Sequence, residues 1–364
     1  MKKIDISLRK ILSIALSILL IASNVAMAAP VVATGSGATK VYLAPNGVPV
    51  VDINTANGAG LSHNTFIEYN VEKNGLILNN GNKSQIARQS QLAGQIIANQ
   101  NLNAEAKFIL NEVTSPNRTR LEGFTEVLGG KADVIIANPF GITAEGVGFI
   151  NTDRVTLTAG TSIIGADGAL SGFNVSKGDI LIQGEGINGS AQQLLDIVTR
   201  SAKIDGQINV PTLNILTGTN QWNYAAGTNK SDYAADGVTG DATPDGAAPT
   251  YAIDSTVLGG LYADRIRIIA TEDGAGVRTL GEAAANADDF TLTSDGKIEI
   301  KSKISAERDI DITGTETGAD SLTLTGTSLS AKHNIDLTAV EGGAKITGGK
   351  IIASVNLTEK FGAL

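Results

Sequence analysis

The residue types that most often carry catalysis or bind metals are scarce in this chain. Cysteine is absent from the 364 residues, and the two histidines, His63 and His333, stand far apart. A chain without cysteine cannot form disulfides, thiolate zinc sites, iron–sulfur clusters or a cysteine nucleophile. Neither a nucleophile elbow nor a phosphate-binding loop is present. The sequence therefore predicts no catalytic residue, no metal site and no cofactor.

Two weaker chemical patterns also lead to structural interpretations. Residues 235–246 are rich in Asp and Gly, as calcium-binding repeats are, but they lack the nonapeptide period of those repeats. Asn-X-Ser/Thr triplets begin at Asn82, Asn117, Asn229 and Asn356. We interpret these triplets as inert surface corners, because Asn favours turns.

Charge and composition narrow the classes of partner and of core. The formal net charge is −9, and nucleic-acid binding relies on a positive field, so no nucleic-acid partner is predicted. An anionic membrane surface is an equally poor partner. Aromatic residues make up only 4% of the chain, so the core must consist of stacked Ile, Val and Leu side chains.

The first 28 residues have the organisation of a signal peptide. A basic start is followed by about a dozen apolar residues and a small-x-small site at Ala26-Met27-Ala28. The apolar stretch is too short to span a bilayer as a helix. We therefore expect cleavage between Ala28 and Ala29 and export of the remainder. The lack of cysteine suits a chain that later crosses a second membrane unfolded, although many exported bacterial proteins simply have no disulfides.

Short apolar–polar–apolar triplets recur along the rest of the chain beside Gly, Asn or Asp. Alternation with period two places both apolar members on one face of a sheet. Strands this short suggest a sandwich, a barrel or a solenoid. Helical windows are nearly absent, and two-residue hairpin turns are rare. We predict an all-β fold: a right-handed single-stranded parallel β-helix with about 20 residues per coil and extra-helical β-hairpin excursions. Near the C-terminus the triplets become regular: Ile298/Ile300, Ile310/Ile312, Leu322/Leu324, Ile335/Leu337 and Val355/Leu357.

Two stretches depart from this pattern. Residues 190–200 suit either a short helix or a buried strand, and the sequence does not decide between them. Residues 223–250 are rich in Gly, Ala, Asp and Thr, which predicts an excursion from the coils that is either mobile or folded as its own small hairpin.

Several dispersed motifs resemble one known family. The chain resembles the two-partner secretion (TPS) domain, the N-terminal module of filamentous haemagglutinins, large haemolysins and contact-dependent growth inhibition proteins of the CdiA type. The resemblance covers roughly residues 46 to 278, with order and spacing kept. The segments that carry it include 46–54 (NGVPVVDIN), 60–71 (GLSHNTFIEYNV), 96–102 (IIANQNL), 132–143 (ADVIIANPFGIT) and 259–266 (GGLYADRI).

The family has two short secretion motifs, Asn-Pro-Asn-Leu and Asn-Pro-Asn-Gly-Ile. In this chain they correspond to Asn99-Gln100-Asn101-Leu102 and Asn138-Pro139-Phe140-Gly141-Ile142. Gln100 replaces a Pro and Phe140 replaces an Asn. The resemblance implies that the motifs help a transporter recognise the chain. Their residue types also suit corners of a β-helix, since Asn, Pro and Gly each favour turns, and the two roles are compatible.

The resemblance also implies an organisation and a partner. Residues 1–28 would be the signal peptide, 29–280 the secretion domain, and 281–364 the start of a repeat β-helix that continues into a longer exoprotein. The partner would be an outer-membrane transporter of the TpsB/CdiB type with periplasmic POTRA domains. The whole protein would pass through the periplasm, be secreted or held at the cell surface, and meet a receptor on neighbouring cells through regions beyond this chain.

The resemblance implies one of two identities for the whole protein. It would deliver a toxin in contact-dependent growth inhibition, or act as a haemagglutinin-type adhesin. A β-helical polysaccharide-active enzyme is the alternative from another class. Such an enzyme needs carboxylates or bases gathered on one face of the coils, and the sequence shows no such cluster.

Overall fold

The computed structural model describes residues 29–225 and 237–362. The chain divides into residues 1–30 and residues 31–364, and the second unit contains the whole of the β architecture. All regular secondary structure in the described ranges is β-strand, from β1 to β37. No helix among these residues is long and apolar enough to cross a membrane. The predicted leader, residues 1–28, lies outside the described residues.

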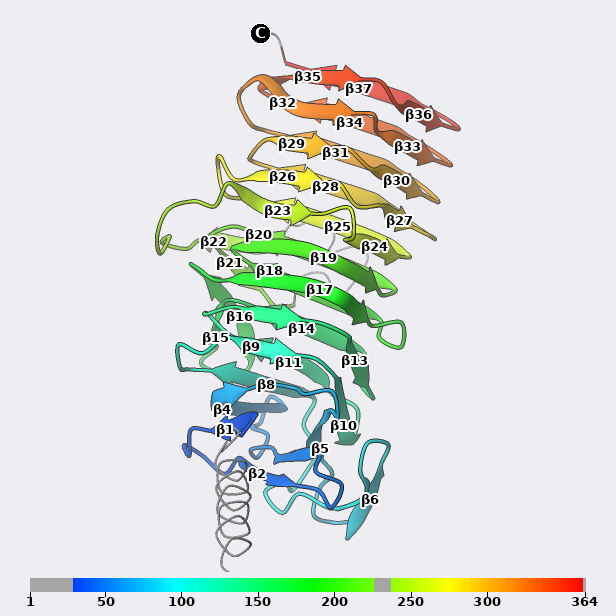
Figure 1. Ribbon diagram of the computed structural model, residues 1–364. Helices are drawn as coiled ribbons and strands as arrows, with labels where there is room; N and C mark the ends of the chain where they lie inside the picture. Colours follow the sequence, from blue (N-terminus) through cyan, green and yellow to red (C-terminus); the bar gives the residue numbers. More distant parts are fainter. Residues whose placement is uncertain (1–28, 226–236, 363–364) are drawn as a thin grey trace, which may run out of the picture. The chain divides into compact units, whose positions relative to one another are not determined.

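One long sheet, which we call sheet A, runs along the stack (Figure 1). Its neighbouring strands are parallel, except that β1 pairs antiparallel with β4 at the N-terminal end. In order, the 12 strands are β1 (Val31–Ala33), β4 (Leu61–Tyr69), β8 (Phe108–Val113), β11 (Asp133–Ala137), β14 (Arg154–Thr158), β18 (Leu194–Thr199), β20 (Thr212–Thr217), β25 (Arg265–Ala270), β28 (Phe290–Ser294), β31 (Ile310–Gly314), β34 (Ile335–Ala339) and β37 (Leu357–Phe361).

The other strands of the coils form a 19-stranded sheet with two branches. Strands β17 (Asp179–Asn188) and β19 (Ser201–Asn209) are long enough to belong to both branches. One branch contains β9 (Thr119–Leu121), β12 (Ile142–Ala144), β23 (Tyr251–Ser255), β26 (Gly276–Thr279), β29 (Ile298–Ile300), β32 (Gly318–Thr325) and β35 (Gly342–Thr347). The second contains β2 (Lys40–Leu43), β3 (Pro49–Asp52), β5 (Leu76–Asn80), β10 (Phe124–Gly129), β13 (Val147–Ile150), β24 (Gly260–Ala263), β27 (Ala283–Ala285), β30 (Lys303–Ala306), β33 (Ser328–Ala331) and β36 (Lys350–Ala353).

Successive passes of the chain therefore stack as coils, and the predicted right-handed single-stranded parallel β-helix is confirmed. Phe290 pairs with Ile310, which is 20 residues later, as the predicted coil length requires. The first four regular triplets of the sequence fall alternately on the two sheets, whereas the fifth was wrong in part: Val355 lies outside the strands, and Leu357 begins β37 on the same sheet as Ile335. Ile298 lies in β29, Ile310 in sheet A, and Leu322 in β32. A spacing of about a dozen residues is thus half a coil.

The core is a set of aliphatic columns along the inside of the stack. Ile266, Phe290, Ile310 and Ile335 pair in register from coil to coil, and all four are fully buried. A slip of one residue would turn such a column outward, so burial fixes the register. The stacked columns thereby satisfy the need for a core with few aromatic side chains.

Two antiparallel excursions leave the coils, as the sequence predicted. The first is the hairpin of β6 (Ala87–Ser90) and β7 (Gly94–Ile97). The second is a four-stranded sheet of β15 (Thr161–Ile164), β16 (Leu170–Val175), β21 (Asn220–Asn223) and β22 (Val238–Asp241). The predicted excursion at 223–250 is thus joined to an earlier one, although residues 226–236 lie outside the described residues.

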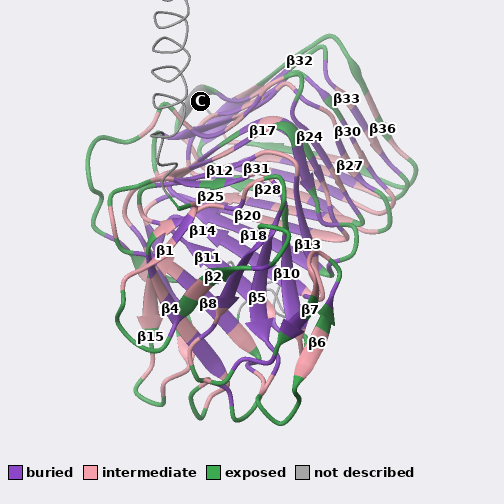
Figure 2. Cartoon of the chain, turned by 60° about the horizontal axis from the view of Figure 1, so that its bottom comes forward, coloured by how far each residue is buried: buried purple, intermediate pink, exposed green. Residues whose placement is uncertain are grey.

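The four-stranded sheet covers part of the outer face of sheet A. Leu110, Ile135, Val198 and Leu216 point outward from sheet A and pack in one buried cluster with Phe173 of the covering sheet. Strands β14 and β18 are consequently buried along their whole length (Figure 2). This burial also resolves the ambiguous stretch 190–200, which contains strand β18 and no helix.

Beyond β25 the outer face of sheet A becomes polar. Asp311 on β31 stands directly beside Asp336 on β34 in the parallel ladder. Partial burial and the neighbouring carboxylates of Asp336, Asp309 and Asp289 raise the pKa of Asp311 to about 6. Because this pKa lies above the ordinary value, the stability linked to the carboxyl is present in full at low pH and is lost as pH rises through about 6.

We expect Asp311→Asn to stabilise the chain at pH 8 and not at pH 4. The amide removes the repulsion between stacked carboxylates, which should raise the midpoint of thermal unfolding by about 1–2 °C at pH 8. Circular dichroism melts at both pH values measure this. Asp273→Asn, at an exposed turn, serves as the control substitution. An equal gain at pH 4 and pH 8 would show that the repulsion is not the cause.

Candidate functional site

The first secretion motif forms a corner directly after β7. The side chain of Asn99 is fully buried, and its Nδ2 donates to the carbonyl oxygens of Ile53 at 2.9 Å and Asn79 at 3.0 Å. Its Oδ1 accepts the backbone N–H of Asn101 at 2.9 Å. The backbone N–H of Leu102 donates to the carbonyl oxygen of Asn99 and closes the turn. One asparagine thus ties three separate segments together.

The second motif repeats this geometry after β11. Asn138 is fully buried, and its Nδ2 donates to the carbonyl oxygen of Asn117 at 2.8 Å and to Oγ1 of Thr119 at 2.9 Å. Its Oδ1 accepts the backbone N–H of Phe140 at 2.9 Å. The N–H of Gly141 donates to the carbonyl oxygen of Asn138. The two corners are built alike, yet they contact different coils.

Gly141 is required by both its conformation and its surroundings. Its φ of 98° lies in the region that favours glycine. A Cβ at this position would also lie 2.8 Å from the carbonyl oxygen of Asp179 and would meet the guanidinium of Arg118. That guanidinium forms an ion pair with Asp179 at 2.8 Å and donates to the carbonyl oxygen of Ile142. The corner is thereby fastened to the following coil.

The motif positions divide cleanly by exposure. Asn99, Leu102, Asn138 and Ile142 are buried, whereas the two positions that depart from the family pattern, Gln100 and Phe140, are exposed. The aromatic ring of Phe140 lies under the ammonium of Lys177, which is 4.8 Å from its centroid. Substitution is therefore tolerated where the side chain meets solvent. The exposed side chains, and not the buried asparagines, are available to a partner of the folded domain.

The remaining predicted positions lie around these corners. Asn101 is half-buried, and its Nδ2 donates to the carbonyl oxygen of Ala38 at 2.8 Å. Pro139 is half-buried at the start of the second turn. Of the predicted cleavage pair, Ala29 is exposed, and Ala28 lies outside the described residues.

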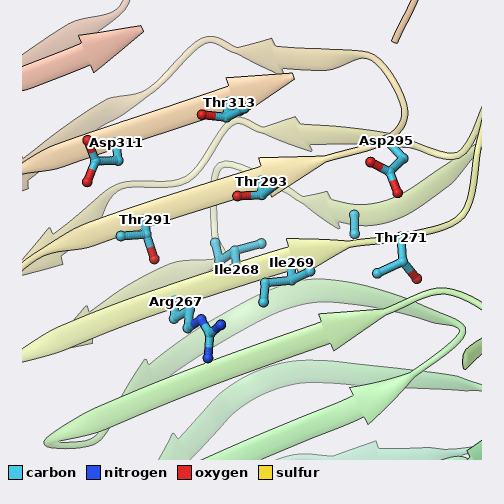
Figure 3. Close-up of a pocket in the computed structure, with 10 residues that line it drawn as sticks. Arg267, Ile268, Ile269, Thr271, Thr291, Thr293, Asp295, Asp311 and Thr313 are labelled. Carbon is cyan, nitrogen blue, oxygen red and sulfur yellow. The ribbon is translucent and has the colours of Figure 1, made fainter. Parts of the chain in front are cut away.

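A hollow of about 370 Å³ lies on the polar part of the outer face of sheet A (Figure 3). Arg267, Thr291 and Asp311 line it from three successive strands, in one column of the ladder. Figure 3 places Asp295 at the opposite end of the hollow from Asp311. This arrangement does not bring the two carboxylates together as a pair for acid–base chemistry.

Sequence reasoning missed a buried polar cluster under the four-stranded sheet. Arg154 on β14 pairs with Asp196 on β18 at 2.8 Å, and both side chains are almost fully buried. The guanidinium lies 4.0 Å from the centroid of the Tyr224 ring, and the hydroxyl of Tyr224 donates to Asp133 at 3.2 Å. Burial raises the pKa of Asp133, and the charge of Arg154 and the hydrogen bond from Tyr224 partly oppose that rise. The sequence signal was a charged residue inside an apolar run, as in Leu194-Leu-Asp-Ile-Val198.

The histidine closest to the motifs has a structural partner. Nε2 of His63 lies 2.8 Å from Oε2 of Glu112. Burial alone would raise the pKa of Glu112, but hydrogen bonds from His63 and from the N–H and hydroxyl of Ser162 outweigh it and lower the pKa. Among the described residues, no three His, Cys, Asp or Glu side chains group as metal ligands.

Comparison with known families agrees with this geometry. The family model described as the TPS secretion domain matches residues 27–300. This chain belongs to the TPS secretion domain family. Members of the TPS family are exported across the outer membrane and are secreted or attached to the surface, and membership implies a transporter of the TpsB type as partner.

Curated relatives of this TPS domain are much longer proteins. The 16S rRNA endonuclease CdiA of Enterobacter cloacae is 39% identical over 96% of this chain, and the tRNA nuclease CdiA of Escherichia coli O6:K15:H31 is 41% identical over 78% of it. The chain spans only 11% and 8% of these relatives, respectively. The similarity therefore concerns a small part of each relative.

A solved structure supports the same assignment. The crystal structure of the filamentous hemagglutinin secretion domain matches with a TM-score of 0.72 and 28% sequence identity, covering 91% of this chain and all of that one. This TPS domain therefore shares its β-helix with the haemagglutinin group as well as its sequence with the CdiA group.

We expect Asn138→Ala to destabilise the TPS domain by about 2–4 kcal/mol. The substitution removes three hydrogen bonds and leaves buried partner groups unsatisfied. Phe140→Asn, which restores the residue of the family motif two positions away, should change the free energy of unfolding by less than about 0.5 kcal/mol. Urea unfolding followed by circular dichroism compares the two variants. Equal effects would contradict the structural role of Asn138.

Proposed function

We propose that this chain is the export module of a large surface exoprotein and that its folding outside the cell drives export. The observation that carries the proposal is the pair of asparagine corners. Each of the two proposed recognition motifs contains a buried asparagine that ties coils together and has one exposed side chain at its tip. A motif of this kind serves recognition while the chain is extended and folding once it has emerged.

The transporter would bind the chain before it folds. We propose that periplasmic POTRA domains of a TpsB/CdiB-like transporter contact the two motifs while the leaderless chain, cut between Ala28 and Ala29, is still unfolded in the periplasm. In that state Asn99 and Asn138 are exposed to a partner, whereas in the folded domain both are buried. Recognition and folding would therefore follow one another in time.

Folding would then supply the direction of movement. A β-helix coil contacts mainly its neighbours, so coils can be added one after another as the chain emerges. Each fully buried aliphatic side chain contributes about 1.5–3 kcal/mol before the loss of conformational entropy is subtracted. A small net gain for each coil is enough to bias diffusion outward.

The whole protein would deliver a toxin to neighbouring cells on contact. The names of the curated relatives are those of nucleases and toxins named CdiA, and the chain corresponds to a small part of them. The toxin and the receptor-binding region would lie beyond this chain. Residues 281–364 would begin the repeat β-helix leading to them.

Catalysis would have no part in this chain. A secretion domain is not a catalytic one, and the carboxylates of the hollow on sheet A lie apart (Figure 3). A haemagglutinin-type adhesin is the second candidate for the whole protein, because the solved structure that matches is a hemagglutinin secretion domain. A polysaccharide-active enzyme has no comparable support.

The test is secretion with and without folding. The chain would be expressed with the transporter encoded beside its own coding region, and its amounts in the periplasm and the medium would be compared by immunoblot. We expect Ile136→Asp, which places a charge in the fully buried core, to lower the amount in the medium at least about tenfold, because the coil cannot form. Ile86→Asp, at a position that is 90% exposed beside the hairpin of β6 and β7, is the matched control and should leave secretion unchanged.

Two results would contradict the proposal in different ways. Normal secretion of an unfolded Ile136→Asp chain would remove folding as the driving force. Release into the medium from cells that lack the transporter would remove the transporter as the partner.

A further inference from the structure

The four-stranded sheet joins two parts of the chain that are far apart in sequence. Strands β15 and β16 precede β17, whereas β21 and β22 follow β20, so two coils separate them. The link is the antiparallel pairing of β16 with β21, in which Phe173 stands opposite Trp222. We call residues 161–175, 220–225 and 237–245, which contain the four strands and the turns beside them, the clasp.

The clasp covers coils whose residues precede it in the sequence. Its Phe173, Trp222 and Tyr224 belong to the same buried cluster as Leu110 of β8 and Ile135 of β11. The rings of Phe173 and Trp222 are stacked, with centroids 6.2 Å apart. Without β21, these apolar side chains on the outer face of β8 and β11 would lose much of their cover.

Polar contacts tie the clasp to both ends of the covered region. Toward the N-terminal end, Nδ2 of Asn57 donates to the carbonyl oxygen of Gly168 at 2.7 Å. Toward the C-terminal end, Arg200 forms an ion pair with Glu272 at 2.7 Å and donates to the carbonyl oxygen of Asp245 at 3.0 Å. Between them, Tyr224 reaches Asp133 and Arg154. The clasp therefore bridges coils from β4 to β25.

The coils that follow are built differently. One outward column of sheet A contains the apolar side chains of Leu216 and Ile269. In the next coils the same column continues with Thr293, Thr313 and Thr338. Threonine tolerates water, so these coils do not depend on a second layer. The requirement for the clasp ends where the apolar outer face ends.

We propose that the clasp makes the coils from β4 to β20 one cooperative folding unit, which closes only when β21 docks on β16. The early coils, although complete in sequence, stay unstable until residues 220–241 are available. This step of the inference rests on the proposed function: the delay keeps both secretion motifs extended while the transporter binds the chain. The later coils then add to a finished unit.

Trp222 allows a direct test, because it is the one tryptophan of the chain and lies in the clasp. The chain without residues 1–28 is refolded from urea, and the burial of Trp222 is followed by stopped-flow fluorescence. Pulsed hydrogen exchange reports when the amides of β8 and β11 become protected. We expect their protection to appear at the rate of the Trp222 change. Protection of β8 and β11 well before Trp222 is buried would overturn the proposal.

A matched pair of glycine variants distinguishes an effect on the clasp from a general loss of stability. A Cβ at Gly172 of β16 would collide with the carbonyl oxygen of Trp222, and a Cβ at Gly296 would collide with that of Ala275 in a later coil. Gly172→Ala should slow the protection of β8 and β11 at least about fivefold, and Gly296→Ala should leave it unchanged. Slowing confined to 161–175 and 220–241 would overturn the proposal.

A milder variant keeps the test informative if Gly172→Ala does not fold. Tyr224→Phe removes only the hydrogen bond to Asp133, retains Trp222 as the probe, and should slow β11 and Trp222 together. Slowing of Trp222 alone would overturn the proposal. Because refolding involves no transporter, these outcomes are independent of the secretion test.

Discussion

The structure depends on one constraint, the in-register pairing of each coil with the next. The strands are three to ten residues long, and a strand of this length cannot satisfy its backbone groups or bury its apolar face alone. The parallel ladder solves both problems together, because the neighbour that accepts the hydrogen bonds also extends the aliphatic column. At the N-terminal end of the described stack, β1 and β2 pair antiparallel with β4 and β3 and cover the edges of the first parallel strands.

The same ladder explains why the outer face of sheet A changes character along the stack. Each outward position belongs to a column, so its environment is shared with the coils before and after it. Under the clasp, separate outward columns contain Ile135 and Val198, and even the charged side chains among these columns form the buried pair of Arg154 and Asp196. Such a pair is no strong source of stability by itself, but the loss of one partner would leave the charge of the other uncompensated beneath the second layer. Beyond Ile269 the outward columns are polar and need no cover.

The sequence predicted the features that depend on residues close together in the chain, and it missed those that depend on distant residues. Period-two triplets are local, so they were sufficient for the β-helix, the coil length and the inner columns. The second layer depends on pairing between β16 and β21, which no local pattern specifies. The one local sign of the second layer was the run Leu194–Thr199, which is too apolar for a strand with one solvated face. Taken alone, such a run suits a helix as well as a strand. The secretion motifs were found by resemblance, but the burial of Asn99 and Asn138 arises from contacts between distant coils, which the motifs do not encode.

The asparagine corners and the clasp both provide contacts between segments that are far apart in the sequence. Asn99 and Asn138 replace missing backbone partners at the turns between coils, with amide groups that donate to carbonyl oxygens up to 46 residues away in the sequence. The clasp does the same for apolar surface, because residues 220–224 cover side chains contributed about a hundred residues earlier, such as Leu110. In both cases, a segment nearer the N-terminus gains its contact only when a later segment of the chain is in place. By the proposed delay, a module organised in this way would remain unfolded longer than its strand pattern alone suggests, which suits the proposed passage through a membrane before folding.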